Sequence, residues 1–209
     1  MKRELFVRLA FCMVLVLGVS GAIGGQTGMP QPFSADFTTT SGTGGEMNTG
    51  KIYFSLPKMR MESSTKGQDS IIIMDQSIQT VYILMPKQRM YIESRTDQQN
   101  PMMRQGPKTP TSFDPSHPCG ANVTCNKVGT ETVNGRVCDK WVTTGIKGTS
   151  TAWIDQKLSF PVKTRSAAGE IWQLTNIREG KPDASLFELP AGYQKMVIPG
   201  MPGGGPPPQ

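Results

Sequence analysis

Apolar and polar residues alternate with a period of two through residues 50–94, and this pattern constrains the fold more than any other feature of the sequence. Within the segment 51–56, the side chains of Ile52, Phe54 and Leu56 fall on one face, and the more polar residues between them fall on the other. Successive side chains of a β-strand point to opposite faces of the sheet. The stretch therefore predicts a meander of short strands with one dry face and one wet face.

Similar segments of β-branched and aromatic residues, separated by turn residues, predict strands along most of the chain. The expected strands lie at 33–40, 51–56, 59–62, 71–74, 79–85, 151–155, 160–165 and 170–177, with a hairpin from residue 127 onward. Asp183 is placed to cap a short helical turn that includes Leu186 and Phe187. Beyond the N-terminal region we find no long amphipathic helix.

Two predicted hairpins fix registers that the structure can test. If residues 86–87 form the centre of a two-residue turn, Val81 faces Ile92 and Ile83 faces Met90, so that the apolar residues of both strands share one face. A slip by one residue would destroy this match. The agreement indicates a real hairpin.

Residues 134–135, Asn-Gly, form the strongest short hairpin signal in the chain, because both tolerate the positive φ of a type I′ turn. The implied register places Val128 opposite Trp141, and Cys138 opposite Glu131 on the other face.

The cysteines indicate one disulfide. Cys119 and Cys125 close a short loop that contains a glycine, CGANVTC, and we expect them to pair, which leaves Cys138 as the spare thiol. A Cys125–Cys138 bridge stays open as the alternative.

The chain divides by composition into a leader, a β domain and a tail. Basic residues 2, 3 and 8, an apolar run over 9–19 and small residues after it are typical of a secretory signal peptide. We expect a cleaved signal peptide at 1–24, a flexible lead-in at 25–32, a β domain at 33–196 that contains a Pro-rich loop at 95–118, and a disordered Pro/Gly tail at 197–209. The mature protein is therefore expected to be periplasmic or secreted, with no membrane span.

Several function classes are disfavoured by the residues present. Removing Lys2, Arg3, Arg8 and Glu4 with the signal peptide lowers the formal net charge from +6 to +4, and the remaining basic residues are scattered, which argues against nucleic acid. The chain has one histidine, His117, in the Pro-rich loop, and lacks the common hydrolase, zinc and phosphate-binding motifs. We expect no enzyme activity, no metal and no cofactor.

Five blocks, in this order and spacing, carry a family resemblance: GKIYFSLPKMRME from residue 50, the hairpin around Tyr82 and Tyr91, GTETVNGR from 129, TAWIDQKLSFPVK from 151 and SLFELPAGYQKM from 185. Over 33–196 the chain resembles the LolA-like superfamily of outer-membrane lipoprotein carriers, and within it the small bacterial members of unknown function. The resemblance implies a mainly β fold with little helix, a curved and incompletely closed antiparallel half-barrel with an apolar concave face. In the carriers, acyl chains bind at that face beneath covering helices. No functional residue is carried over, because these blocks do not define the carrier's shuttle surface.

The dry face is the candidate binding site. Its methionines suit a surface that accommodates varied apolar shapes, because their side chains are flexible and polarizable. The predicted site consists of Ile52, Phe54, Met59, Met61, Val81, Ile83, Met85, Met90, Ile92 and Trp141. The first hypothesis is an exported, non-enzymatic protein that binds a lipid, an acyl chain or another apolar ligand there. The alternative is an envelope protein-interaction or stress-sensing module whose core is filled and which binds a protein partner.

Overall fold

The computed structural model describes residues 28–65, 67–95, 124–145 and 148–196. The predicted signal peptide, the tail and all of the Pro-rich loop except Arg95 lie outside these residues, and so does Cys119. The domain boundaries and the Cys119–Cys125 disulfide therefore stay predictions.

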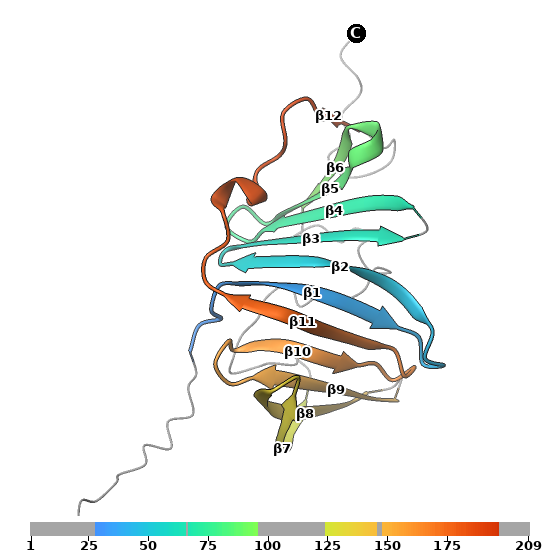
Figure 1. Cartoon of the computed structure of the whole chain (residues 1–209), viewed down its shortest axis with the longest axis vertical. Coiled ribbons are helices and arrows are strands. Elements are labelled where there is room, and N and C mark those ends of the chain that lie inside the picture. Colours follow the sequence, from blue (N-terminus) through green and yellow to red (C-terminus); the bar gives the residue numbers. More distant parts are fainter. Residues whose placement is uncertain (1–27, 66, 96–123, 146–147, 197–209) are drawn as a thin grey trace, which may run out of the picture.

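Twelve strands form one sheet in the order β12-β6-β5-β4-β3-β2-β1-β11-β10-β9-β8-β7 (Figure 1). The strands are β1 (Phe33–Thr40), β2 (Glu46–Ser55), β3 (Lys58–Thr65), β4 (Gln68–Asp75), β5 (Thr80–Met85), β6 (Met90–Arg95), β7 (Cys125–Val133), β8 (Arg136–Gly145), β9 (Gly148–Asp155), β10 (Phe160–Arg165), β11 (Ile171–Glu179) and β12 (Gln194–Lys195). Two 3-10 helices, η1 (Pro86–Gln88) and η2 (Ala184–Phe187), complete the described elements. The pairing is antiparallel throughout, except that β12 lies parallel to β6.

The predicted fold class is confirmed: the sheet is mainly antiparallel, curved and not closed into a barrel. The curvature is visible in one aromatic contact. β1 and β11 lie between β2 and β10, so that three strand spacings, about 14 Å in a flat sheet, separate those two strands. The ring centroids of Phe54 in β2 and Phe160 in β10 are nevertheless 4.9 Å apart. The sheet bends until these side chains meet in the core.

The registers of β2 to β6 align side chains in rows that cross the sheet. One row, Phe54–Met59–Met74–Val81–Ser94, is buried along its whole length. A second row lies two residues along each strand from the first and consists of Ile52–Met61–Ile72–Ile83–Ile92. In this row Ile52 is buried and the other four side chains are half-buried. Both rows lie on the face that carries the hydrophobic core, which we call the inner face. The opposite side of β1 to β6 is the outer face.

The predicted β5–β6 hairpin has the correct face but the wrong register. Ile83 faces Ile92, and Val81 faces Ser94. The connection is longer than the two residues assumed, because η1 occupies it and Arg89 follows in the left-handed region at φ 51°. A connection lengthened by two residues shifts the register by two and preserves the faces.

The Asn-Gly hairpin is present, with φ values of 49° at Asn134 and 76° at Gly135. Cys138 faces Glu131, as predicted. The predicted pairing of Val128 with Trp141 is wrong, because a β-bulge between Lys127 and Gly129 inserts one extra residue and brings Lys127 opposite Trp141.

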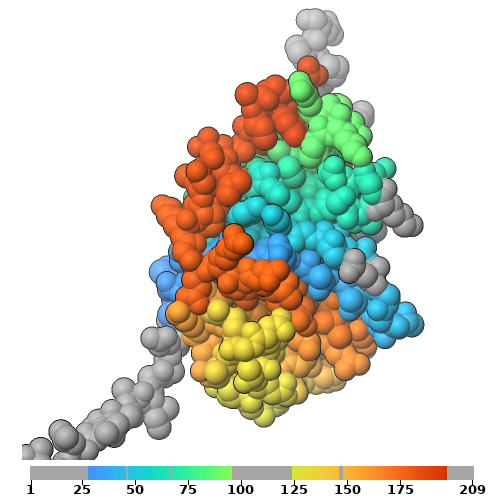
Figure 2. All heavy atoms as spheres, in the orientation of Figure 1, coloured from blue at the N-terminus to red at the C-terminus, as the bar shows by residue number. Residues whose placement is uncertain are grey.

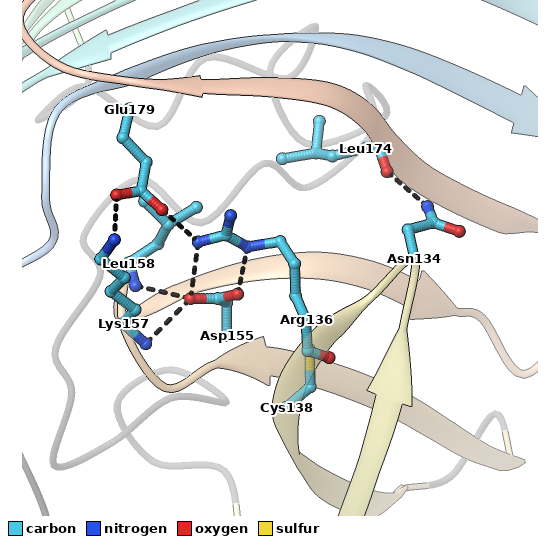
Figure 3. A network of polar contacts seen from close by, with 8 residues as sticks. All are labelled: Asn134, Arg136, Cys138, Asp155, Lys157, Leu158, Leu174 and Glu179. Atoms are coloured by element: carbon cyan, nitrogen blue, oxygen red, sulfur yellow. Dashed lines mark hydrogen bonds and ion pairs between the residues drawn. The ribbon is translucent and has the colours of Figure 1, made fainter.

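A polar network fixes the β7–β8 hairpin against β11 (Figure 3). Asn134 donates from Nδ2 to the carbonyl oxygen of Leu174 over 2.9 Å. Arg136 forms an ion pair with Asp155 and donates from Nη2 to Glu179 over 2.8 Å. These contacts join β8, the β9–β10 turn and β11, and they hold the curved part of the sheet together.

Candidate functional site

Six half-buried apolar side chains form the candidate site on the inner face of β3 to β6. We call this group the inner apolar surface, and it consists of Met61, Ile72, Ile83, Met85, Met90 and Ile92. Met61, Ile72 and Ile83 pack directly against the buried core. The inner apolar surface is therefore continuous with the hydrophobic core and extends it along the inner face to β6.

The predicted site residues fall into three groups. Ile52, Phe54, Met59 and Val81 are 1%, 3%, 7% and 1% exposed and belong to the core cluster. Met61, Ile83, Met85, Met90 and Ile92 lie on the inner apolar surface. Trp141 lies in β8, where it faces Ala152. Five strands lie between β3 and β8 in the sheet, so Trp141 is far from the inner apolar surface. The binding role of all three groups stays a prediction.

The sequence pattern missed Ile72. Three isoleucines follow one another at 71–73, so that alternation alone does not show which of them faces inward. The structure pairs Ile72 with Met61 and with Ile83, which places it at the centre of the inner apolar surface. Its even spacing from Met74 along β4 is the signal that could have found it.

Charged residues of this part of the sheet lie on the outer face. This holds for every charged residue in β1, β3, β4, β5, β6 and the segment 48–55 of β2. The residues are Asp36, Lys51, Lys58, Arg60, Glu62, Asp69, Asp75, Glu93 and Arg95. A charge held against the inner face would find no counter-ion among these described strand residues, and an unpaired buried charge is strongly unfavourable. The inner face therefore suits an uncharged, apolar occupant.

The outer face of β3 to β5 is covered by the C-terminal segment. Arg60 donates from Nη1 to the carbonyl oxygen of Leu186 over 2.8 Å, and Phe187 of η2 is buried. Asp183 accepts a hydrogen bond from the backbone N–H of Ser185, which confirms the predicted cap. Figure 2 shows this segment, in red, beside the strands coloured cyan and green. Of the two faces of these strands, the outer one is thus occupied by the chain itself.

Ionisable groups on the outer face have shifted pKa values with structural causes. Burial opposes ionisation of Asp75, but hydrogen bonds from Ser77 and the nearby ammonium group of Lys58 lower the pKa of this carboxyl overall. Burial raises the pKa of Tyr82, and the carboxylate of Glu93 adds to the effect. These shifts come from packing and pairing outside the inner apolar surface, so they mark no acid–base pair within it.

Metal and membrane sites were sought among the described residues. No group of three or more His, Cys, Asp or Glu side chains in that part of the chain is arranged to hold a metal ion. None of the described helices has the length and apolar character needed to cross a membrane. His117 lies outside the described residues. The expected lack of enzyme activity stays a prediction.

Comparisons with known proteins give a family and a fold. Residues 36–159 match the model of a domain of unknown function, DUF4412. An uncharacterized conserved protein from Thermus thermophilus is 12% identical with a TM-score of 0.55, and the match covers 80% of this chain and 91% of that one. A chain of the Pseudomonas aeruginosa MucA/MucB complex is 17% identical with a TM-score of 0.51, covering 80% of this chain and 59% of that one.

A LolA superfamily protein from Nitrosomonas europaea also matches, at 10% identity and a TM-score of 0.31, over 78% of this chain and 93% of that one. A comparison with curated proteins finds no match. The predicted resemblance to LolA-like proteins of unknown function is confirmed. At these identities the structural matches establish the fold and no shared activity.

Proposed function

This chain belongs to the DUF4412 family of unknown function, and from that premise we propose that it is an exported, non-enzymatic binding protein that holds the apolar part of a lipid or similar ligand on its inner apolar surface. One observation carries the proposal. Six half-buried apolar side chains lie together on a sheet face, and the charged residues of β1, β3 to β6 and the segment 48–55 of β2 lie on the opposite face.

The energetics favour an apolar chain as the occupant. Fully burying one Ile or Met side chain contributes roughly 1.5–3 kcal/mol. These six side chains are already about half-buried in the free protein. A ligand that covers the rest of their apolar surface would therefore gain roughly 1 kcal/mol of binding free energy from each. Three of the six are methionines, which adapt to different chain shapes. We therefore expect broad selectivity among acyl chains.

Protein binding is the second candidate function, and the fold match supports it. The Pseudomonas aeruginosa protein of similar fold was solved in a MucA/MucB complex. In this alternative, the inner apolar surface is part of a filled core and the protein recognises an envelope partner with another surface.

Mass spectrometry of what co-purifies with the native, exported protein separates the two. The lipid proposal expects an acyl-chain compound in organic extracts, and displacement of a bound apolar dye by fatty acids. Extracts free of lipid, together with a dye signal that fatty acids leave unchanged, would sink the proposal. A stoichiometric protein in place of a lipid would favour the second function.

A further inference from the structure

We propose that the free edge of β7 is a self-association surface, on which a second copy of this chain pairs its own β7 in antiparallel fashion. The inference does not depend on the proposed ligand. It rests on the two ends of the sheet, which differ in length and in how they are protected.

One end of the sheet is a strand of two residues, Gln194–Lys195, which lies along β6. The other end is β7, with nine residues, seven of which are exposed. Within the described part of the chain, β7 pairs with β8 alone. A short edge strand offers little to a neighbour, whereas a long one presents a row of N–H and C=O groups that can accept another strand. Figure 1 shows β7 at this end of the sheet.

The turn geometry identifies which backbone groups are available. A two-residue type I′ turn at Asn134–Gly135 makes Val133 and Arg136 a hydrogen-bonded pair. Bonded and non-bonded pairs alternate along an antiparallel ladder. Glu131 therefore bonds to β8, whereas Thr130 and Thr132 direct their N–H and C=O groups toward the free edge.

The charges of β7 do not guard this edge. Charged side chains commonly protect edge strands from pairing. Here Lys127 is paired with Asp139 of β8 over 2.7 Å. Glu131 accepts hydrogen bonds from Lys140 of β8 and from Trp153 of β9, over 2.5 and 2.7 Å. Both charged side chains are therefore engaged by residues of β8 and β9 and do not extend beyond the free edge of β7.

The strand is complementary to itself. A two-fold axis at Thr130 places Thr130 opposite its own copy, Val128 opposite Thr132, and Glu131 opposite Gly129. No like charges meet, and the β-branched pairs favour strand pairing. Val128, which is 56% exposed, would gain a partner.

The length of the hydrogen-bonded ladder between the two copies of β7 determines how tightly the dimer is held. The β-bulge between Lys127 and Gly129 interrupts the strand, so that the continuous ladder runs over 128–132. A contact of this length lies below the size of stable permanent interfaces. We therefore expect a weak dimer whose population rises with concentration. The hairpin is held in place by the Asn134–Leu174 hydrogen bond, which reduces the ordering cost of pairing.

Sedimentation velocity of the exported protein over a concentration series tests the proposal, with three variants. Thr130→Pro removes an N–H that points to the edge, and Val128→Lys adds a charge there. Val137→Lys is the matched control, because Val137 is 52% exposed on β8, one strand away from the edge. Because the two-fold axis makes each loss occur twice, we expect Thr130→Pro and Val128→Lys to weaken dimerisation by about tenfold or more. Val137→Lys should leave it unchanged.

Circular dichroism and thermal melting of each variant establish that it is folded. If Thr130→Pro does not fold, the comparison of the two lysine variants decides. A protein that stays monomeric at every concentration overturns the proposal. A dimer that Val128→Lys leaves intact, or that both lysine variants weaken equally, overturns it as well.

Discussion

Arg136 in β8 and Asp155 at the end of β9 form an ion pair in which the carboxylate is almost fully removed from solvent. The Asp155 side chain is 2% exposed and that of Arg136 is 20% exposed. Asp155 also accepts hydrogen bonds from the backbone N–H groups of Lys157 and Leu158, over 2.9 and 2.6 Å. The carboxylate thus fixes the β9–β10 turn and, through Arg136, the hairpin next to it.

Removing Arg136 should destabilise the fold strongly. Arg136→Ala leaves the buried Asp155 carboxylate without its ion-pair partner, and breaking a buried pair in this way costs about 3 kcal/mol or more. Lys157→Ala is the control, because the Lys157 side chain is 72% exposed in its pair with Glu179, and such surface pairs contribute less than about 1 kcal/mol. Urea unfolding followed by tryptophan fluorescence gives both values. Equal losses in the two variants would show that the buried pair has no special role.

Gly50 should not tolerate a side chain. A Cβ atom there would lie 1.8 Å from the carbonyl oxygen of Glu62 and 2.8 Å from the ring of Phe37. The backbone of β3 would have to shift to relieve this overlap, so Gly50→Ala should lower the free energy of unfolding by about 2 kcal/mol or more. Gly145→Ala, where a Cβ meets nothing within 4 Å, is the matched control. Thermal melting of the two variants checks this, and an unchanged midpoint for Gly50→Ala would contradict it.

Cys138 should behave as an inert thiol. Its side chain is free and 0% exposed, and burial raises its pKa to about 11, with the Asp155 carboxylate adding to the shift. Because the folded protein holds this proton more tightly than the unfolded chain, the thiol's contribution to stability falls as pH rises from about 9 toward 11. Ellman's reagent at pH 8 should label Cys138 only after denaturant is added. Rapid labelling of the native protein would contradict this burial.

The alternation of residues predicted the faces of β2, β3, β5 and β6 correctly, because a side chain's face depends only on its position along its own strand. Register depends on the connections as well. The left-handed residue Arg89 and the extra residue Val128 each changed a register that assumed the simplest turn or ladder. The two residues of β12 have no periodicity to detect, and their parallel pairing with β6 depends on the path of the whole C-terminal segment.

The candidate site was predicted in part for a similar reason. Strand periodicity distinguishes the inner face from the outer face, but not a covered position from an open one. Phe54 is buried because Phe160, more than a hundred residues later, packs on it. Met61, on the same face, is only half-buried, although Ile52 opposite it in β2 is 1% exposed. Only the curvature of the whole sheet separates these two cases.

Adjacent isoleucines in β4 allow the two faces to be compared directly. Ile71 and Ile72 are both half-buried, but Ile72 lies on the inner apolar surface, whereas Ile71 faces Glu62 and Leu84 on the outer face. Replacing either one with asparagine removes a similar apolar area from a similar place in the strand. The two variants should therefore lose similar stability, each roughly 1 kcal/mol for a half-buried side chain.

Ligand binding should separate them. Ile72→Asn places a polar amide where an acyl chain would pack, so we expect its affinity for a fatty acid to fall about tenfold, equivalent to 1.4 kcal/mol, while Ile71→Asn binds as the unchanged protein does. Dye displacement by oleate measures both variants, and thermal melting confirms that their stabilities match. If the two variants lose affinity equally, the inner apolar surface is not the binding site, and if neither loses any, the ligand lies elsewhere.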